Sequence, residues 1–282
     1  TDEIELNGLA FSDLGDIEKP DHEDGEKRVA TFLADVRENY KLLIALGGDN
    51  SITYSVTAGL WPDLSKIGLI TLDAHHDLRD GISNGSPVWR LIQSGLSGKN
   101  IVQIGISDFA NSKAYTDRAN ENGVHVVYRD VLRKRPISDV MAEALDIAGS
   151  GGREIYVDLD VDVCDRSVAP ACPASVPGGI SADELRQAAH LAGSDSRVRA
   201  IDITEIDANE DQYSLSTANN EKLLDEDTFL FLHEDDTFIV NEADVVVAAE
   251  ISADNEEIGQ KIIDDDILDF SEQNPFSLTR TF

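Results

Sequence analysis

The chain of 282 residues is long enough to bury a substantial core, and its 41% hydrophobic content is ordinary for a globular protein. It carries 55 acidic against 23 basic residues, for a net charge of −32. This excess repels nucleic acid and anionic membranes, so we expect neither as a partner. It is also typical of proteins kept soluble at high salt, which predicts a halophilic source.

Targeting and redox signals are sparse. The first residues lack the basic and apolar regions of a signal peptide, and no apolar run approaches the roughly 18 residues of a membrane span. The two cysteines, Cys164 and Cys172, are too few for a disulfide scaffold and are expected to be free thiols. We therefore predict a soluble, cytoplasmic protein.

Apolar periodicity predicts alternating strands and helices. In chain order these are a helix over 26–39, a strand over 42–46, a helix ending near residue 60, a strand over 67–72, a helix over 88–93, strands over 101–105 and 124–128, a helix over 137–147, a strand over 155–160, a helix over 182–192 and a strand over 198–203. This alternation predicts a three-layer α/β/α fold around a mainly parallel sheet. Ligand groups in such folds gather beyond the carboxyl ends of the strands.

The composition changes after about Asp207. Residues 209–282 hold one glycine, and their only basic residues are Lys222, Lys261 and Arg280. We therefore predict a catalytic domain over 1–208, followed by an acidic segment over 209–282 that is in part disordered and adds little to the sheet. Two apolar stretches within it, 228–232 and 245–251, could form strands.

The first candidate site follows the apolar strand over 67–72, which ends in Asp73, His75 and Asp77. Alternate residues of an extended segment project from one face, so these three side chains are expected to converge. Carboxylates grouped with an imidazole suit a hard or borderline divalent metal ion. The intervening His76 should point the opposite way, where it either contacts the ligand residues or faces solvent. The simpler alternative is an acidic strand end that faces water.

A second acidic cluster ends the strand over 155–160. Alternation places Asp158, Asp160 and Asp162 on one face, where three buried carboxylates would repel one another unless cations neutralise them. A solvated edge strand is the alternative. Together the two clusters offer more ligands than one metal ion needs, which favours two metal ions bridged by shared carboxylates.

Four sequence blocks resemble those of the ureohydrolases, the family of arginases, agmatinases and formimidoylglutamases. The blocks are Gly-Gly-Asp-Asn-Ser at 47–51, Asp-Ala-His-His-Asp at 73–77, the Asp-rich run at 158–165 followed by Pro-Gly-Gly, and Asp-Ile-Thr-Glu at 202–205. The resemblance implies an arginase-like fold, a homo-oligomer and two manganese ions. It further implies metal ligands at Asn50, Asp73, His75, Asp77, Asp160 and Asp162, with Asp73 and Asp160 bridging. His75 and Asp162 would complete one metal site, and Asn50 and Asp77 the other.

Two departures from the family pattern bear on the metal site and on the choice of substrate. Asn50 stands where the family usually has histidine, so the metal ion there is expected to be held less tightly. Asn84 begins the segment where arginases carry a proton-shuttling histidine, which disfavours arginase activity and leaves Asn84 as a substrate-binding candidate. Arg79 can grip a carboxylate bidentately and would repel agmatine; its alternative is a surface ion pair with Asp80.

The resemblance is strongest to formimidoylglutamases. It implies hydrolysis of a linear amidine, N-formimidoyl-L-glutamate, to L-glutamate and formamide. Asp77 would orient the hydroxide generated between two Mn²⁺ ions, and Glu205 would stabilise the tetrahedral intermediate. Alternatives are an agmatinase or another guanidino-acid hydrolase, or a truncated metal-binding relative without turnover, because the first family strand and the closing helix have no recognisable counterpart.

Overall fold

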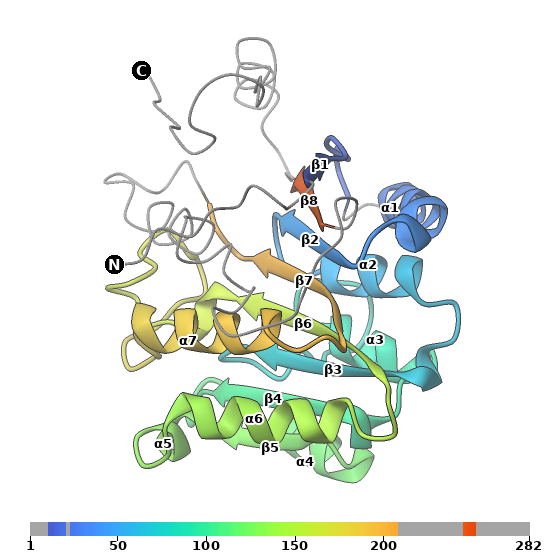
Figure 1. The fold of residues 1–282 in the computed structure, drawn as a ribbon. Helices are drawn as coiled ribbons and strands as arrows, with labels where there is room; N and C mark the ends of the chain where they lie inside the picture. The colour runs from blue at the N-terminus through green and yellow to red at the C-terminus, as the bar shows by residue number, and fades with distance from the viewer. Residues whose placement is uncertain (1–10, 21–22, 208–244, 252–282) are drawn as a thin grey trace, which may run out of the picture.

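The computed structural model describes residues 11–20, 23–207 and 245–251 (Figure 1). Its centre is an eight-stranded sheet in which every neighbouring pair is parallel. The strands lie in the order β1 (Phe11–Asp13), β8 (Val245–Ile251), β2 (Leu42–Gly47), β7 (Val198–Thr204), β6 (Glu154–Asp160), β3 (Ile67–Leu72), β4 (Ile101–Ile106) and β5 (His125–Tyr128). The predicted parallel sheet is confirmed.

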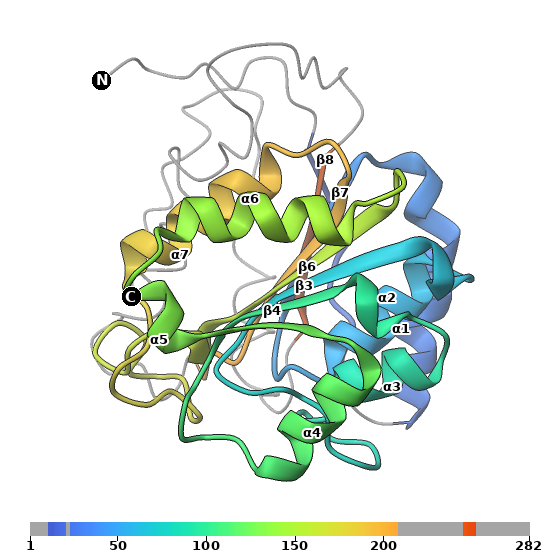
Figure 2. The same cartoon turned by 90° about the horizontal axis from the view of Figure 1, so that it is seen from below.

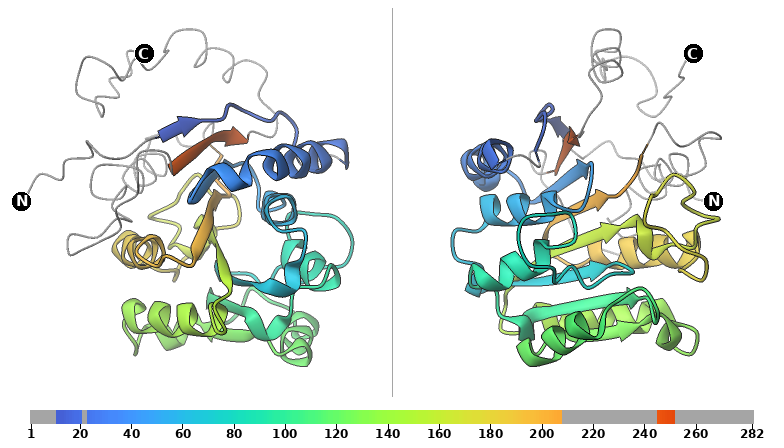
Figure 3. Two further views of the ribbon diagram at one scale, coloured as in Figure 1. Left: turned by 45° about the vertical axis from the view of Figure 1, so that its right-hand side comes forward. Right: turned by 180° about the vertical axis from the view of Figure 1, so that it is seen from behind.

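Helices cover both faces of the sheet. They are α1 (Glu23–Val36), α2 (Ile52–Leu60), α3 (Pro87–Gln93), α4 (Lys113–Asn122), α5 (Arg129–Leu132), α6 (Ile137–Ala148) and α7 (Ala182–Gly193), with short 3₁₀ turns at Arg37–Asn39, Leu64–Lys66, Gly98–Asn100 and Val161–Val163. Figures 2 and 3 show α6 and α7 on one face and α1, α2, α3 and α4 on the other. This is the predicted three-layer α/β/α arrangement. In the described ranges no helix is both long and apolar enough to cross a membrane.

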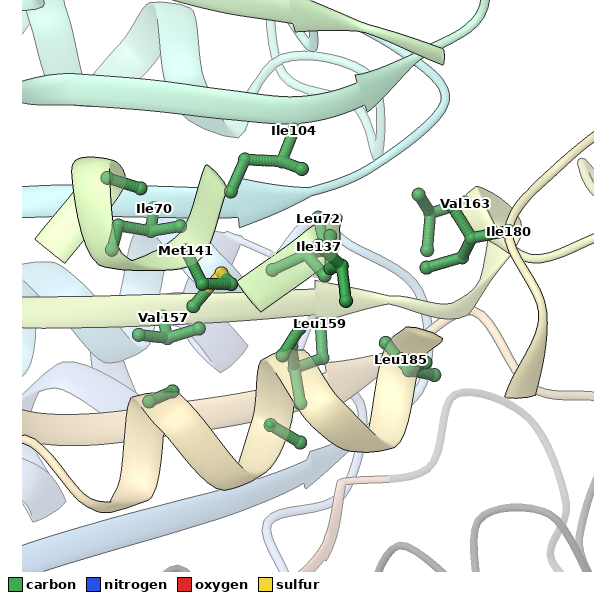
Figure 4. Close-up of a cluster of buried hydrophobic side chains, with 14 of the residues drawn as sticks. Ile70, Leu72, Ile104, Ile137, Met141, Val157, Leu159, Val163, Ile180 and Leu185 are labelled. Carbon is green, nitrogen blue, oxygen red and sulfur yellow. The ribbon is translucent and has the colours of Figure 1, made fainter. Parts of the chain in front are cut away.

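An apolar core lies on each face of the sheet, between the sheet and the helices that cover it. In one, Met141 of α6 and Leu185 of α7 belong to the same buried cluster as Ile70 and Leu159 of the sheet (Figure 4). The other packs α1, α2 and α3 against the opposite face of the sheet. All six residues of β3 and of β4 are buried, as expected for strands covered on both sides. The sheet is therefore a rigid base for the loops at its carboxyl edge.

The predicted elements match closely, but β1, α4 and α5 were not predicted. The bounds of β3 are those expected, and α1 begins three residues before the expected start at residue 26. The helix α4 was not singled out by apolar periodicity, because Ala119 is its only buried residue. Its ends are instead marked by the cap Ser112, whose hydroxyl accepts from Tyr115 N, and by the left-handed Gly123.

The C-terminal region contributes to the sheet. Strand β8 lies between β1 and β2, with Val245 paired to Phe11 and to Leu42. The expectation that residues 209–282 add little to the sheet is therefore wrong for residues 245–251, whose β-branched run suits a strand paired on both sides. The other apolar stretch, 228–232, lies outside the described residues, and the domain boundary near residue 208 stays a prediction.

Candidate metal centre and active site

Sheet order explains why distant sequence blocks meet. The strands β2, β7, β6 and β3 are consecutive neighbours, and all run in the same direction. The carboxyl ends of these strands therefore lie along one edge of the sheet. In open parallel sheets, ligands commonly bind at this edge, at the point where the order of the strands reverses. These ends lead into Asn50, Glu205, the pair Asp160 and Asp162, and the loop 73–77. All six predicted metal ligands belong to segments at this edge.

One compact group contains Asp73, His75 and Asp162, with one candidate ligand atom from each lying within 4.8 Å of the others. The Nδ1 atom of His75 is 2.6 Å from Oδ2 of Asp162. The other oxygen, Asp162 Oδ1, accepts from Ala74 N at 2.8 Å, and Asp160 Oδ1 accepts from Asp162 N at 2.8 Å. Hydrogen bonds thus join the loop after β3 to the turn after β6.

A second group contains Asn50, Asp77 and Glu205. Asn50 Nδ2 donates to Asp77 Oδ2 at 2.6 Å, and the backbone Asn50 N donates to Glu205 Oε1 at 3.0 Å. Asp77 and Glu205 are buried although each is a carboxylate. The structure therefore brings Asn50 and Asp77 together, as expected for two residues proposed to share a metal ion.

Reversing the side-chain amide of Asn50 would suit metal binding. Its Oδ1 accepts from Thr53 Oγ1 at 2.8 Å and from Thr204 Oγ1 at 3.2 Å, while Thr53 Oγ1 also lies 2.8 Å from Asp202 Oδ2. A hydroxyl has one proton and cannot donate to both acceptors. Reversing the Asn50 amide lets Thr53 donate to Asp202 and accept from Asn50 Nδ2. The reversed amide turns its oxygen toward Asp77, where a cation would be needed between the two oxygens.

The backbone of both clusters differs from the extended form expected. Strand β3 ends at Leu72, and the loop that follows bends so that Asp77 has φ = 52°. Glu205 has φ = 67°, and Lys19 is the only other non-glycine residue with positive φ in the described ranges. Asp162 lies in the 3₁₀ turn Val161–Val163 rather than in a strand. Convergence thus depends on sharp turns, and such rare backbone conformations concentrate at functional sites.

Asp158 lies deeper than the clusters. It is paired in register with Asp202 on β7 and with Thr71 on β3, and all three are fully buried. Asp202 Oδ2 accepts from Tyr156 Oη at 2.6 Å, whereas both oxygens of Asp158 lack a hydrogen-bond partner among the described residues. Asp158 therefore lies buried within the sheet, and the solvated edge strand considered for this segment is wrong.

Burial shifts the acidity of the site. It raises the pKa of Asp77 to about 7, with the Asp162 charge adding to the effect. Burial also raises the pKa of Asp73 and of Asp160, again with Asp162 as a second cause. The hydrogen bond to Asp162 raises the pKa of His75 to about 11. Without a bound cation, these side chains therefore keep protons that a metal ion would displace.

These shifts predict how the stability of the metal-free protein depends on pH. The pKa of Asp77 rises from 3.8 to about 7 on folding, so between those values the folded state binds more protons than the unfolded chain. The free energy of unfolding should therefore fall as the pH rises through this window. His75 acts in the same direction above pH 6.5, because its pKa rises from 6.5 in the unfolded chain to about 11 in the folded state. Urea unfolding with a chelator at about pH 5 and about pH 8 measures the effect.

The matched control for this prediction is Asp77→Asn, which removes one titrating group at similar size and should flatten the curve. Bound Mn²⁺ should do the same, because metal binding favours the deprotonated ligands. A free energy of unfolding that rises between about pH 5 and about pH 8 in chelator would contradict the account.

His76 and its partners were incompletely predicted. His76 is fully buried, so the solvated alternative for it is wrong. Its Nδ1 lies 2.8 Å from Gln103 Oε1, and its backbone N donates to Asn111 Oδ1 at 3.0 Å. Sequence reasoning missed both partners, although Gln103 is the one polar side chain in the otherwise apolar β4. Burial lowers the pKa of His76 and keeps its ring neutral.

Arg79 lies in the loop after Asp77, and its side chain crosses Gly85. A Cβ atom at position 85 would lie 2.6 Å from Arg79 Nε, so the glycine makes room for the guanidinium. In the described residues no ion pair joins Arg79 to Asp80. Arg118 Nη1 instead lies 3.1 Å from Asp80 Oδ1, so the surface pair considered for Arg79 is wrong. Asn84 Nδ2 is 3.5 Å from Glu205 Oε1, which places Asn84 beside the second group.

The residues present fit a divalent metal centre. Asp73 is fully buried, and its Oδ2 has no hydrogen-bond partner among the described residues. Such a carboxylate oxygen needs a proton or a cation. The donors are carboxylate oxygens, one imidazole and one amide, a set that suits Mn²⁺ and similar ions. Both cysteines are free and buried, and burial raises the pKa of each thiol to about 12, so they are not candidate ligands.

Comparison with known proteins adds an independent line of support. The profile of the arginase family matches residues 1–225. A formimidoylglutamase from Halalkalibacterium halodurans is 36% identical over 215 residues, covering 73% of this chain and 67% of that relative. An agmatinase from Bacillus subtilis is 27% identical over 210 residues, covering 72% of this chain and 69% of that relative.

Solved structures agree. The crystal structure of formimidoylglutamase from Bacillus subtilis superposes with a TM-score of 0.70 at 29% identity, covering 75% of this chain and 68% of that one. The sequence matches span between 53% and 67% of the length of the first three formimidoylglutamase relatives. The matched part of this chain therefore spans roughly half to two thirds of the length of such a protein.

Proposed function

The chain belongs to the arginase family, and from this we propose that it is a binuclear manganese hydrolase that converts N-formimidoyl-L-glutamate and water to L-glutamate and formamide. The observation that carries the proposal is the buried convergence of Asp73, His75 and Asp162 beside Asn50 and Asp77. The 36% identity to a formimidoylglutamase supports the substrate. The predicted amidine hydrolase activity is thus supported by the site and by the relatives together.

The family resemblance and the positions of these side chains support the following roles. Asp73, His75, Asp160 and Asp162 would hold one metal ion, and Asp77 and Asn50 would complete the coordination of a second, with Asp73 and Asp160 shared. When bound, two such ions activate water as a nucleophile and polarise the amidine. Asp77 orients the water and takes up its proton, then returns it to the nitrogen that leaves with glutamate.

Glu205 would act on the substrate itself. Its carboxylate is buried beside Asn50, and Oε1 also lies 3.5 Å from Asn84 Nδ2. A carboxylate fixed in this way can accept hydrogen bonds from the cationic amidine and offset its charge as the carbon becomes tetrahedral. Asn84 would hold Glu205 and the substrate in place but cannot shuttle protons.

Basic side chains favour an acidic substrate. Arg79 is exposed in the loop after Asp77 and forms no ion pair within the described residues. On the other side, a cavity of about 380 Å³ reaches Asp162 and is lined by Arg129 and Arg133. Asp108 and Asp130 also line this cavity; Lys134 Nζ lies 2.6 Å from Asp130 Oδ2, and Arg129 Nη2 lies 3.8 Å from Glu184 Oε2. The exposed guanidinium of Arg79 is therefore the group that most favours a substrate with a carboxylate over a cationic one.

The second candidate is hydrolysis of agmatine or another guanidino compound, which the agmatinase relative supports. Arg79 disfavours agmatine, because its cationic tail would be repelled. A metal-binding relative without turnover is the third possibility. Metal binding alone would account for the burial of Asp73, Asp77 and Asp160, but not for that of Glu205, which is no proposed metal ligand and therefore favours turnover.

One experiment separates these functions. Formamide release from N-formimidoyl-L-glutamate, urea release from agmatine, and manganese per chain should be measured on the same Mn²⁺-loaded sample. We expect about two manganese ions per chain and turnover of the formimidoyl substrate. Metal binding without release of either product would indicate the non-catalytic relative, and a preference for agmatine would overturn the substrate.

Asn50 sets the affinity of the second metal ion. Imidazole is a better ligand than a neutral amide, so Asn50→His should tighten manganese binding and reduce the Mn²⁺ needed for activity, by about tenfold. Thr204→Val is the matched control, because it changes a neighbour of the amide without adding a ligand. Titration of Mn²⁺ followed by activity measures both. Identical titrations for Asn50→His and the parent would place residue 50 outside the metal's ligands.

The remaining predictions rest on composition and resemblance. We propose a cytoplasmic homo-oligomer from a high-salt setting, in keeping with the net charge of −32. The same charge supports a small-molecule substrate and no nucleic-acid or membrane partner.

A further inference from the structure

Two amide side chains outside the metal cluster hold the loop that carries its ligands. Gln103 is fully buried in β4, and its Nε2 donates to the His76 carbonyl at 2.9 Å while its Oε1 lies 2.8 Å from His76 Nδ1. With Nε2 donating, Oε1 accepts, so His76 carries its proton on Nδ1. Gln103 therefore fixes both the ring and the carbonyl of one residue.

Asn111 fixes the other side of the same residue. Its Oδ1 accepts from His76 N at 3.0 Å, and its Nδ2 donates to Ala74 O at 2.9 Å and to Ser107 O at 3.3 Å. Every backbone and ring polar group of His76 then has a partner, because Thr116 Oγ1 also lies 3.4 Å from Nε2.

The position of His76 makes this arrangement consequential. It lies between His75, whose ring reaches Asp162, and Asp77, whose backbone has the rare φ of 52°. A residue with this φ persists only where its surroundings hold it. Trp89 N donates to Asp77 O at 3.1 Å on the far side, so Asp77 is held between that bond and the fixed His76.

We propose that Gln103 and Asn111 are positioning residues that clamp His76 and thereby set the metal affinity of His75 and Asp77, although neither amide touches the metal site. The inference rests on the proposed metal centre for its effect on affinity. Residues that hydrogen-bond to metal ligands commonly change metal affinity by about 10- to 100-fold, and this clamp acts on the ligands through His76, the residue that joins them. The effect on the loop itself does not need a metal ion.

Asn100 offers a matched control. It is also a buried amide, and its Nδ2 donates to Ile67 O at 3.3 Å, at the opposite end of the same strand β3. Asn100→Ala removes a buried hydrogen bond to this strand and should lower thermal stability, as Gln103→Leu does. It leaves the loop 73–77 untouched, so it separates a general loss of stability from a loss of positioning.

The test measures Mn²⁺ affinity by calorimetry, and hydrogen exchange of the amides of residues 74–78 in chelator. Gln103→Leu should weaken Mn²⁺ binding by about 10- to 100-fold and speed exchange of the residue 76 amide, to which Gln103 does not bond. Asn100→Ala should change both by less than about twofold. Asn111→Asp keeps the acceptor and loses the donor, so its effects on Mn²⁺ affinity and on exchange should lie between those of Gln103→Leu and Asn100→Ala.

Each outcome decides the proposal. Unchanged Mn²⁺ affinity and unchanged exchange in Gln103→Leu would overturn it, as would equal effects in Asn100→Ala. If Gln103→Leu does not fold, Asn111→Asp gives the same readouts. If the parent protein binds no Mn²⁺, the proposed metal centre fails, and the exchange experiment alone then decides whether the amides hold the loop.

Discussion

Asp160→Ala should remove most bound manganese and lower kcat by at least about 10³-fold. The two metal ions are expected to share this carboxylate, so its loss affects both rather than one. Metal ions stabilise charge in the transition state by several kcal/mol, and each 1.36 kcal/mol is tenfold in rate. Metal analysis of the purified variant, together with formamide release at saturating Mn²⁺, measures both consequences.

Two controls separate metal binding from folding. Asp160 Oδ1 accepts from Asp162 N at 2.8 Å, so the alanine variant also loses a bond that shapes the turn. Asp160→Asn keeps an acceptor for that bond and should fold normally while still binding manganese poorly. Asp139→Ala removes an exposed carboxylate on α6 and should change nothing. Full activity in Asp160→Ala would show that the cluster is not the reaction centre.

Local sequence patterns predicted the elements well where burial is continuous. Strand β3 is buried along its whole length, and its bounds followed from the apolar run that ends before Asp73. The same reasoning missed α4, which buries only Ala119 and therefore carries little periodicity. Apolar patterning reports contact with the core, so an element that packs lightly leaves a weak signal.

The sequence predicted that Asp73, His75 and Asp162 lie together, but not the shape of the segments that carry them. Ligand types and strand ends identified Asp73 and Asp162, yet both clusters were expected to stay extended. The turns that bring them together depend on tertiary contacts, such as the bond from Ala74 N to Asp162 Oδ1, which join residues 88 positions apart. The clamp by Gln103 and Asn111 was missed for the same reason, because single polar residues give no periodic signal.

The acidic C-terminal region shows the limit of composition. A shift toward acidic residues predicted an appendage, and composition cannot reveal which strand a short apolar run will pair with. Strand β8 lies between β1 and β2 and so continues the sheet beside the strand that leads to Asn50. We infer that residues 245–251 support the β2 end of the site.

The substrate depends most directly on Arg79, and Arg79→Ala should lower kcat/KM for N-formimidoyl-L-glutamate by about 10- to 100-fold. Hydrogen bonds to charged groups contribute roughly 1.5–3 kcal/mol, which corresponds to this range. Most of the loss should appear in KM if the guanidinium binds ground state and transition state equally. Arg79→Lys should recover only part of it, because an ammonium cannot present the planar fork that matches a carboxylate.

The control for Arg79→Ala is a second substrate, agmatine, rather than a second variant. Agmatine has no carboxylate, so its hydrolysis, if any, should be unchanged or slightly faster in Arg79→Ala, since a repelling cation is gone. A folding defect or a loss of metal would slow both substrates alike. Equal kcat/KM for the formimidoyl substrate in the parent and in Arg79→Ala would remove Arg79 from substrate binding. It would leave the metal centre intact, because Arg79 is two residues beyond Asp77 and bonds to Gly85 through its backbone.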